Sequence, residues 1–132
     1  MANKLPDSYK DIFSKKTFMH LATLTPEGSP HVSPVWVDLD GDQIVVNSAK
    51  GRFKDKNMRA DPRVACSGTD PENPYRSVMV RGKVVKITEE GADEHIDKMA
   101  RKYLGQEKYP NRQPGEVRVL YYIQPERVAT MN

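Results

Sequence analysis

The sequence predicts a mainly β protein in which six strands form a small barrel with three flanking helices. Three observations support this fold class: short runs that alternate apolar and polar residues, turn signals between them, and one long amphipathic helical segment. The predicted strands are residues 17–25, 29–39, 43–48, 63–69, 76–87 and 117–124. Because closure removes exposed strand edges, strands joined by short connections favour a barrel.

The first half of the chain reads as a short helix over 5–16 followed by a three-stranded meander. A tight turn is expected around 26–28, and the Asp40-Gly41 pair is a strong hairpin signal. Pro34 lies inside the second predicted strand. Since proline cannot donate to a ladder, it places that strand at an edge or at a bulge.

The second half predicts two more helices, over 51–60 and 88–105. Thr88 is the expected N-cap of the longer helix, and Gly105 is expected to end it. The longer helix has an apolar stripe made of Ile96, Met99, Ala100, Tyr103 and Leu104. Gly82 interrupts the alternation of the fifth strand, which indicates a bulge.

Length and composition exclude several classes of protein. The 132 residues fit one domain, and a net charge of +3 does not by itself indicate a nucleic-acid partner. No apolar run approaches the roughly 20 residues that would span a membrane. The single cysteine, Cys66, allows no intramolecular disulfide and is interpreted as a small buried side chain. We therefore expect a cytoplasmic protein with neither a nucleic-acid nor a membrane partner.

A dense group of basic residues follows the third strand: Lys50, Arg52, Lys54, Lys56 and Arg59. A solvated helix face is the simple explanation, because lysine and arginine are good helix formers.

Three neighbouring features favour a phosphate site instead. Asn47 and Ser48 place small polar groups at the strand end, Gly51 permits close backbone approach, and a helix N-terminus attracts anions. Arg52 and Lys54 would be the charged partners of the phosphate. The spacing is not that of a P-loop.

The proline-interrupted strand is the second candidate site. Backbone groups freed around Ser33, Pro34, Val35 and Trp36 could orient a flat conjugated ring. The alternative is a structural bulge with Trp36 in the core.

Histidine and cysteine chemistry receives little support. If the first turn centres on residues 26 and 27, His20 lies opposite Ser33, with His31 on the same sheet face. No third ligand completes a metal site, and we expect none. His95 is interpreted as structural. No nucleophile motif or carboxylate pair indicates acid–base catalysis, so the catalytic residues are unknown.

The segment "NPYRSVMVRG" combines aromatic and basic residues. It is typical of an ordinary strand entry, although stacking on a nucleic acid is a second interpretation. A third is that Tyr75, Arg76 and Ser77 complete a ligand site across a dimer interface.

Four stretches together resemble a known family: "LATLTPEGSPHVSPVWVDLDGD", "IVVNSAKGRFKDKNMRADPRV", "VMVRGKVVKITEEGADEHIDKMARKYLG" and "RVLYYIQPERV". They resemble the split β-barrel flavin and deazaflavin oxidoreductases, the superfamily that includes pyridoxamine 5′-phosphate oxidase. The likeness is greatest to the small coenzyme F420-dependent oxidoreductases called the PPOX class. It spans most of residues 18–128 in order.

The resemblance implies a homodimer with two cofactor sites at the subunit interface. It implies phosphate binding by Asn47, Ser48, Arg52 and Lys54, and a ring-cradling strand at 33–36. Tyr75, with Arg76 and Ser77, would come from the second subunit. Lys50 and Lys56 would meet the acidic tail of the deazaflavin.

The function that follows is hydride transfer between reduced deazaflavin and a small organic acceptor. The alternatives are an FMN-binding oxidoreductase of the same fold and a non-catalytic carrier of a cofactor such as haem. Two departures from the family pattern are the small Cys66 and Gly68. The second strand, "HVSPVW", lacks the arginine and lysine pattern of true pyridoxamine phosphate oxidases, which argues against that substrate.

Overall fold

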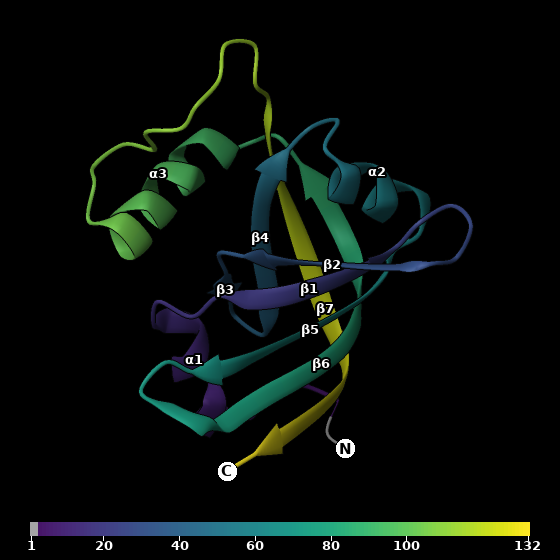
Figure 1. Ribbon diagram of the computed structural model, residues 1–132, viewed down its shortest axis with the longest axis vertical. Helices are drawn as coiled ribbons and strands as arrows, with labels where there is room; N and C mark the ends of the chain where they lie inside the picture. Colours follow the sequence, from purple (N-terminus) through teal and green to yellow (C-terminus); the bar gives the residue numbers. More distant parts are fainter. Residues whose placement is uncertain (1–2) are drawn as a thin grey trace.

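One antiparallel sheet dominates the fold in the computed structural model, which describes residues 3–132 (Figure 1). Its strands are β1 (Met19–Leu24), β2 (Pro30–Val35), β3 (Asp38–Asp40), β4 (Gln43–Ala49), β5 (Arg63–Asp70), β6 (Asn73–Thr88) and β7 (Arg118–Met131). Their order across the sheet is β2-β1-β5-β6-β7-β4-β3. The helices are a 3-10 turn at Asp7–Tyr9, α1 (Asp11–Ser14), α2 (Phe53–Ala60) and α3 (Ala92–Leu104).

The prediction of six strands in a closed barrel is wrong in both count and closure, because the described sheet has seven strands and two free edges. The predicted strand 29–39 is broken at Trp36 and Val37. There the Val37 N–H donates to the Tyr103 hydroxyl, at 3.0 Å, instead of to a neighbouring strand. The first half of the broken strand pairs with β1 and the second half pairs with β4.

The break explains how the sheet is shaped. β2 and β3 lie at opposite edges, yet only two residues separate them along the chain. The sheet must therefore curl so that its two edges approach each other. The position of β2 at an edge confirms the prediction made from Pro34.

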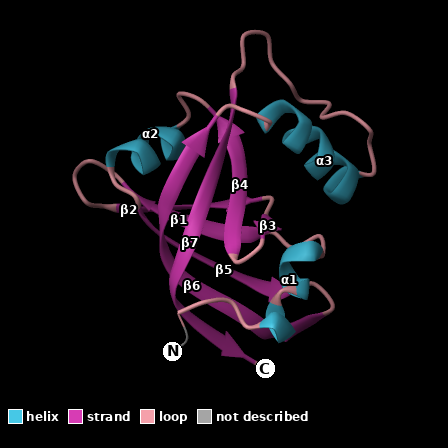
Figure 2. Cartoon of the chain, turned by 180° about the vertical axis from the view of Figure 1, so that it is seen from behind, coloured by secondary structure: helices cyan, strands magenta, loops and turns pink. Residues whose placement is uncertain are grey.

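The main core fills the inside of this curl. It joins side chains of six strands to Phe13 of α1 and Met58 of α2. Cys66 belongs to this core, as expected, and burial raises the pKa of its thiol to about 12. Figure 2 shows α2 and α3 on either side of the strand ends. No helix among residues 3–132 is long and apolar enough to cross a membrane.

Three local predictions concern the bulge of β6 and the two ends of α3. The β6–β7 register shifts at Arg81 and Gly82, which confirms the predicted bulge. Gly105 ends α3 in the left-handed region with a φ of 69°, also as predicted. The N-cap prediction is wrong: Gly91 precedes the helix, and the Thr88 hydroxyl accepts the Glu90 N–H outside it.

The conditional prediction that His20 lies opposite Ser33, on the same sheet face as His31, is wrong. His20 lies opposite Pro34, one residue from the predicted register. Because side chains alternate along a strand, His20 and His31 face opposite sides of the sheet. His31 instead packs edge-on against Phe53, with 4.7 Å between the ring centroids.

Candidate cofactor site

A hollow of about 220 Å³ lies where the end of β2 meets β4, β7 and the start of α2. The loop at 105–117, between α3 and β7, borders it. Six of the predicted cofactor residues line this hollow: Pro34, Val35, Trp36, Asn47, Arg52 and Lys54. The curl of the sheet thus brings together the two candidate sites, the basic segment and the proline-interrupted strand.

Positive charge exceeds negative charge in the hollow. Arg52, Lys54 and Arg118 all line it, while Glu116 is the one carboxylate placed against these cations among the described residues. Burial lowers the pKa of Lys54, and the neighbouring Arg52 and Arg118 lower it further. Burial likewise lowers the pKa of Arg118, although Glu116 opposes this effect. The cations are therefore incompletely neutralised, as an anion-binding site requires.

Arg118 was not among the sequence-predicted residues. It is only 4% exposed, and its Nε donates to Asn47 Oδ1 at 3.0 Å. Its Nη1 lies 3.3 Å from Glu116 Oε1, within ion-pair distance, but makes no hydrogen bond. Buried donors rarely remain without an acceptor, so this unsatisfied N–H is a candidate contact for a ligand oxygen.

Asn47 is held by a network that orients its amide toward Arg118. Its Nδ2 donates to the Ala92 carbonyl at 2.9 Å and lies 3.1 Å from His95 Nδ1. Because Nδ2 is only a donor, His95 Nδ1 must accept, which leaves the imidazole proton on Nε2. Nε2 then donates this proton to Asp38 Oδ2, with 3.0 Å between the nitrogen and the oxygen. His95 thus has the structural role expected from the sequence, in support of the site.

The Asp38 carboxylate anchors the outer end of this network. Burial would raise its pKa, but hydrogen bonds from His95 and Lys98 outweigh that effect and hold the pKa below its usual range. An ionised Asp38 keeps His95, and through it Asn47, in one orientation.

Aromatic rings form the wall of the hollow. Trp36 stacks on Tyr103 with centroids 5.0 Å apart and planes 4° from parallel, while Tyr109 meets it edge-on at 6.1 Å. The Arg118 guanidinium lies 5.2 Å from the centroid of the Tyr109 ring. Trp36 is therefore half-buried between aromatic neighbours and is available at the surface of the hollow.

The loop at 105–117 is tied to α3 by Asp97. This carboxylate accepts the Tyr109 N–H at 2.8 Å and an Arg112 N–H at 3.2 Å. The Tyr109 N–H, more than the nearby Arg112 and Lys108, lowers the pKa of Asp97. The loop thereby fixes Tyr109 beside the cations. Asn111 of the same loop also lines the hollow, and neither residue was predicted.

At the start of α2, one backbone N–H that could bind an anion is already bound to a side chain of the same helix. Gly51 has a φ of 92°, and its N–H donates to Asp55 Oδ2 at 2.9 Å. The other oxygen of Asp55 accepts the Tyr121 hydroxyl at 2.6 Å. Asp55 thus fixes the helix start against the core, and the remaining positive charge comes mainly from side chains.

The other predicted site residues lie outside the lining of the hollow. The hydroxyls of Ser33 and Ser48 are buried without a hydrogen-bond partner, and Ser48 faces the core side of β4, opposite Asn47. Lys50 is exposed near Glu89. Tyr75, at the start of β6, is 78% exposed.

Arg76 is committed to a different cluster. Its guanidinium donates to both oxygens of Asp11, at 2.8 and 2.9 Å, and to Asp70 at 2.9 Å. Both terminal nitrogens of Arg76 are therefore engaged beside α1, and Arg76 does not line the hollow.

These observations fit a ligand with a phosphate and a flat ring. The cations and the unsatisfied Arg118 N–H suit the phosphate. The ring would lie against the outer edge of β2, where backbone groups have no ladder partner in the part of the chain that the structure describes. A curled antiparallel sheet with such a hollow is consistent with a protein that binds a flavin-type cofactor.

Comparison with known proteins agrees with this class. The chain belongs to the pyridoxamine 5′-phosphate oxidase family, whose model matches residues 5–132. A solved structure named F420 reductase is 30% identical, with a TM-score of 0.82, and the match covers 95% of this chain and 98% of that one.

More distant structures share the fold. The conserved protein Rv2991 of Mycobacterium tuberculosis is 23% identical with a TM-score of 0.72, and the match covers 100% of this chain and 88% of that one. HupZ of Group A Streptococcus is 20% identical with a TM-score of 0.68, covering 96% and 93%. No curated protein matches the chain.

Proposed function

We propose that this protein is a coenzyme F420-dependent oxidoreductase that transfers a hydride between reduced deazaflavin and a small organic acceptor. One observation carries the proposal: three cations line a single hollow beside an open strand edge, and among the described residues one carboxylate, Glu116, pairs with two of them. The 30% identity to a protein named F420 reductase favours the deazaflavin over FMN. The proposal includes the cytoplasmic location expected from the sequence.

Each residue has a defined task in this proposal. Arg52, Lys54 and Arg118 bind the phosphate, and Asn47 holds Arg118 in place. Backbone groups of β2 around Pro34 and Val35 orient the ring, and Trp36 excludes water from one side. When bound, the deazaflavin supplies the hydride chemistry, which explains why no side-chain triad is needed.

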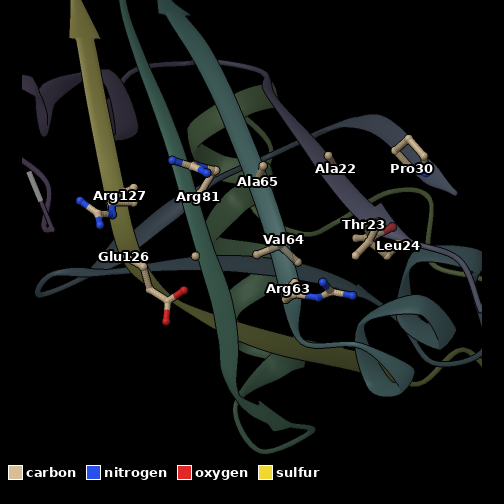
Figure 3. Close-up of a pocket in the computed structure, with 11 residues that line it drawn as sticks. Ala22, Thr23, Leu24, Pro30, Arg63, Val64, Ala65, Arg81, Glu126 and Arg127 are labelled. Atoms are coloured by element: carbon tan, nitrogen blue, oxygen red, sulfur yellow. The ribbon is translucent and has the colours of Figure 1, made fainter. Parts of the chain in front are cut away.

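The proposal also includes a homodimer, formed through the outer face of β1, β5, β6 and β7. Three adjoining hollows of about 420, 380 and 250 Å³ run along this face. Ala65, Arg81 and Arg127 line both of the larger ones, and Figure 3 shows the two arginines on neighbouring strands beside Ala65. A continuous, mainly apolar groove suits a second copy of the chain. The exposed Tyr75 would then reach the partner's cofactor.

Titration of the purified protein with oxidised F420 and, separately, with FMN tests the cofactor assignment. We expect the tighter binding with F420, followed by oxidation of reduced F420 when conjugated acceptors are screened. Tight FMN binding without F420 binding would reverse the choice of cofactor. If neither molecule binds, the hollow is not a flavin-type site.

A further inference from the structure

Glu116 places a negative charge beside the cations of the proposed phosphate site. Its Oε1 lies 3.2 Å from Arg52 Nη2 and 3.3 Å from Arg118 Nη1, two of the three cations of the hollow. Its side chain is only 5% exposed, and its Oε2 is buried without a hydrogen-bond donor. A buried carboxylate with one oxygen unsatisfied is uncommon and costs stability.

The backbone holds Glu116 at this place. Gly115 precedes it in the left-handed region with a φ of 75°, and the Glu116 N–H donates to the Gln113 carbonyl at 3.1 Å. The strand β7 begins two residues later. Glu116 is therefore part of an ordered turn, and a phosphate bound by Arg52 and Arg118 would lie within a few ångströms of its charge.

This proximity penalises each negative charge on the ligand. A phosphomonoester such as FMN carries a charge of about −1.5 to −2 at pH 7. A phosphate esterified on both sides, as in a deazaflavin with an acidic tail, carries a single charge. Because Coulomb repulsion scales with ligand charge and is stronger away from water, Glu116 repels the monoester more than the diester.

We propose that Glu116 is a specificity-determining residue that biases the hollow toward phosphodiesters and against phosphomonoesters. The inference rests on the proposed function, since it assumes that the cofactor phosphate meets Arg52 and Arg118. It adds a physical reason for F420 to be preferred over FMN that the cations alone do not provide.

Two probes isolate the charge effect: the 5′-monophosphate of the deazaflavin ring system and its methyl phosphodiester. They share the ring and the ribityl arm and differ by a methyl group and one negative charge. Dissociation constants are measured at pH 8, where the monoester is fully doubly charged, for the wild type and Glu116→Gln. The neutral variant is expected to bind both probes more tightly, with the monoester gaining about tenfold more than the diester.

The decisive quantity is a ratio: the factor by which Glu116→Gln tightens binding of the monoester, divided by the factor for the diester. If Glu116 only positioned the arginines, its loss would change both affinities by the same factor, and an unchanged ratio overturns the inference while leaving the proposed function intact. Glu116→Asp should keep the discrimination. Glu27→Gln, which removes the same charge from the exposed β1–β2 turn, should leave the ratio unchanged.

Two further outcomes are informative. If melting curves show that Glu116→Gln is unfolded, the smaller neutral variant Glu116→Ser replaces it in the same comparison. If neither probe binds to the wild type or to any folded variant, the hollow is not the phosphate site. That result overturns the proposed function and this inference together.

Discussion

Lys54 is the residue whose environment most directly favours binding of an anion. Its ammonium is partly removed from water, next to Arg52 and Arg118, and its pKa is lowered. Replacing it by alanine should weaken binding of the deazaflavin 5′-monophosphate by about 1.5–3 kcal/mol, the usual contribution of a charged hydrogen bond. Calorimetric titration of the variant measures this loss.

Lys56 supplies the matched control for that experiment. It lies two residues further along α2, is exposed and does not line the hollow. Because the probe has no acidic tail, Lys56→Ala should bind it as the wild type does. If both variants lose the same affinity for the probe, only the overall positive charge of the region matters. If Lys54→Ala binds the probe as tightly as the wild type does, the phosphate binds elsewhere.

Tyr103 joins the site to the core through its hydroxyl, which accepts the Val37 N–H at 3.0 Å and donates to the Thr17 carbonyl at 2.6 Å. Tyr103→Phe leaves the buried Val37 N–H unpaired, so the free energy of unfolding should fall by about 1–3 kcal/mol. Urea denaturation checks this value. Tyr122→Phe, at a half-buried tyrosine of β7, should change the stability much less.

For single residues, the sequence predicted the part of the candidate site that is local in the chain. Arg52, Lys54 and Asn47 lie within eight residues, so strand, turn and helix signals place them together. Arg118 comes from a strand more than sixty residues later. Only the β4–β7 pairing, which places Arg118 opposite Ala49, brings it to the hollow, and no local pattern in the sequence shows that pairing.

Among the elements, the interrupted second strand was the hardest to predict. Its residues are all compatible with a continuous strand, apart from Pro34. The break depends on a residue that is distant in the sequence, because the Tyr103 hydroxyl of α3 accepts the hydrogen bond from the Val37 N–H. The apolar stripe of α3 was correctly predicted at four of its five positions, whereas Leu104 is exposed.

The bulge of β6 requires a glycine at residue 82, and this requirement can be tested. A Cβ on Gly82 would collide with the backbone carbonyl oxygen of Gln124 on β7, whereas one on Gly68 would meet the flexible end of the Met19 side chain. Gly82→Ala should therefore lower the free energy of unfolding by about 1–3 kcal/mol, and Gly68→Ala should lower it less. The two variants are compared by denaturant titration. Equal effects would show that strand propensity, and not the close approach at the bulge, determines the cost.

For the whole molecule, several carboxylates link stability to pH. The hydrogen bond from Arg76 lowers the pKa of Asp11 to about 2, and the Tyr109 N–H lowers that of Asp97. A depressed pKa stabilises the folded state above the unfolded-state value of about 4, and this stability is lost as the pH falls through the folded-state value. The free energy of unfolding should thus be steady near neutral pH and decline from about pH 4 to about pH 2. Thermal melts across this range test the decline, and a decline that begins above pH 6 would implicate other groups.

If the homodimer forms through the outer face, a charge placed in its groove should disrupt association. Val32 of β2 is 62% exposed and lines the groove, whereas Val85 of β6 is 48% exposed at a separate hollow beside α2. Removing a carboxylate from water in an interface costs several kcal/mol, so Val32→Glu should shift the protein from dimer to monomer. Val85→Glu adds the same charge outside the groove and should leave the dimer intact.

Sedimentation velocity of the wild type and the two variants at matched concentration distinguishes these outcomes. In the monomeric variant, the exposed Tyr75 can no longer reach a second subunit, so binding of F420 should weaken along with association. A wild type that sediments as a monomer while binding F420 tightly would mean that a single chain completes the site, and the contribution proposed for Tyr75 would then be excluded.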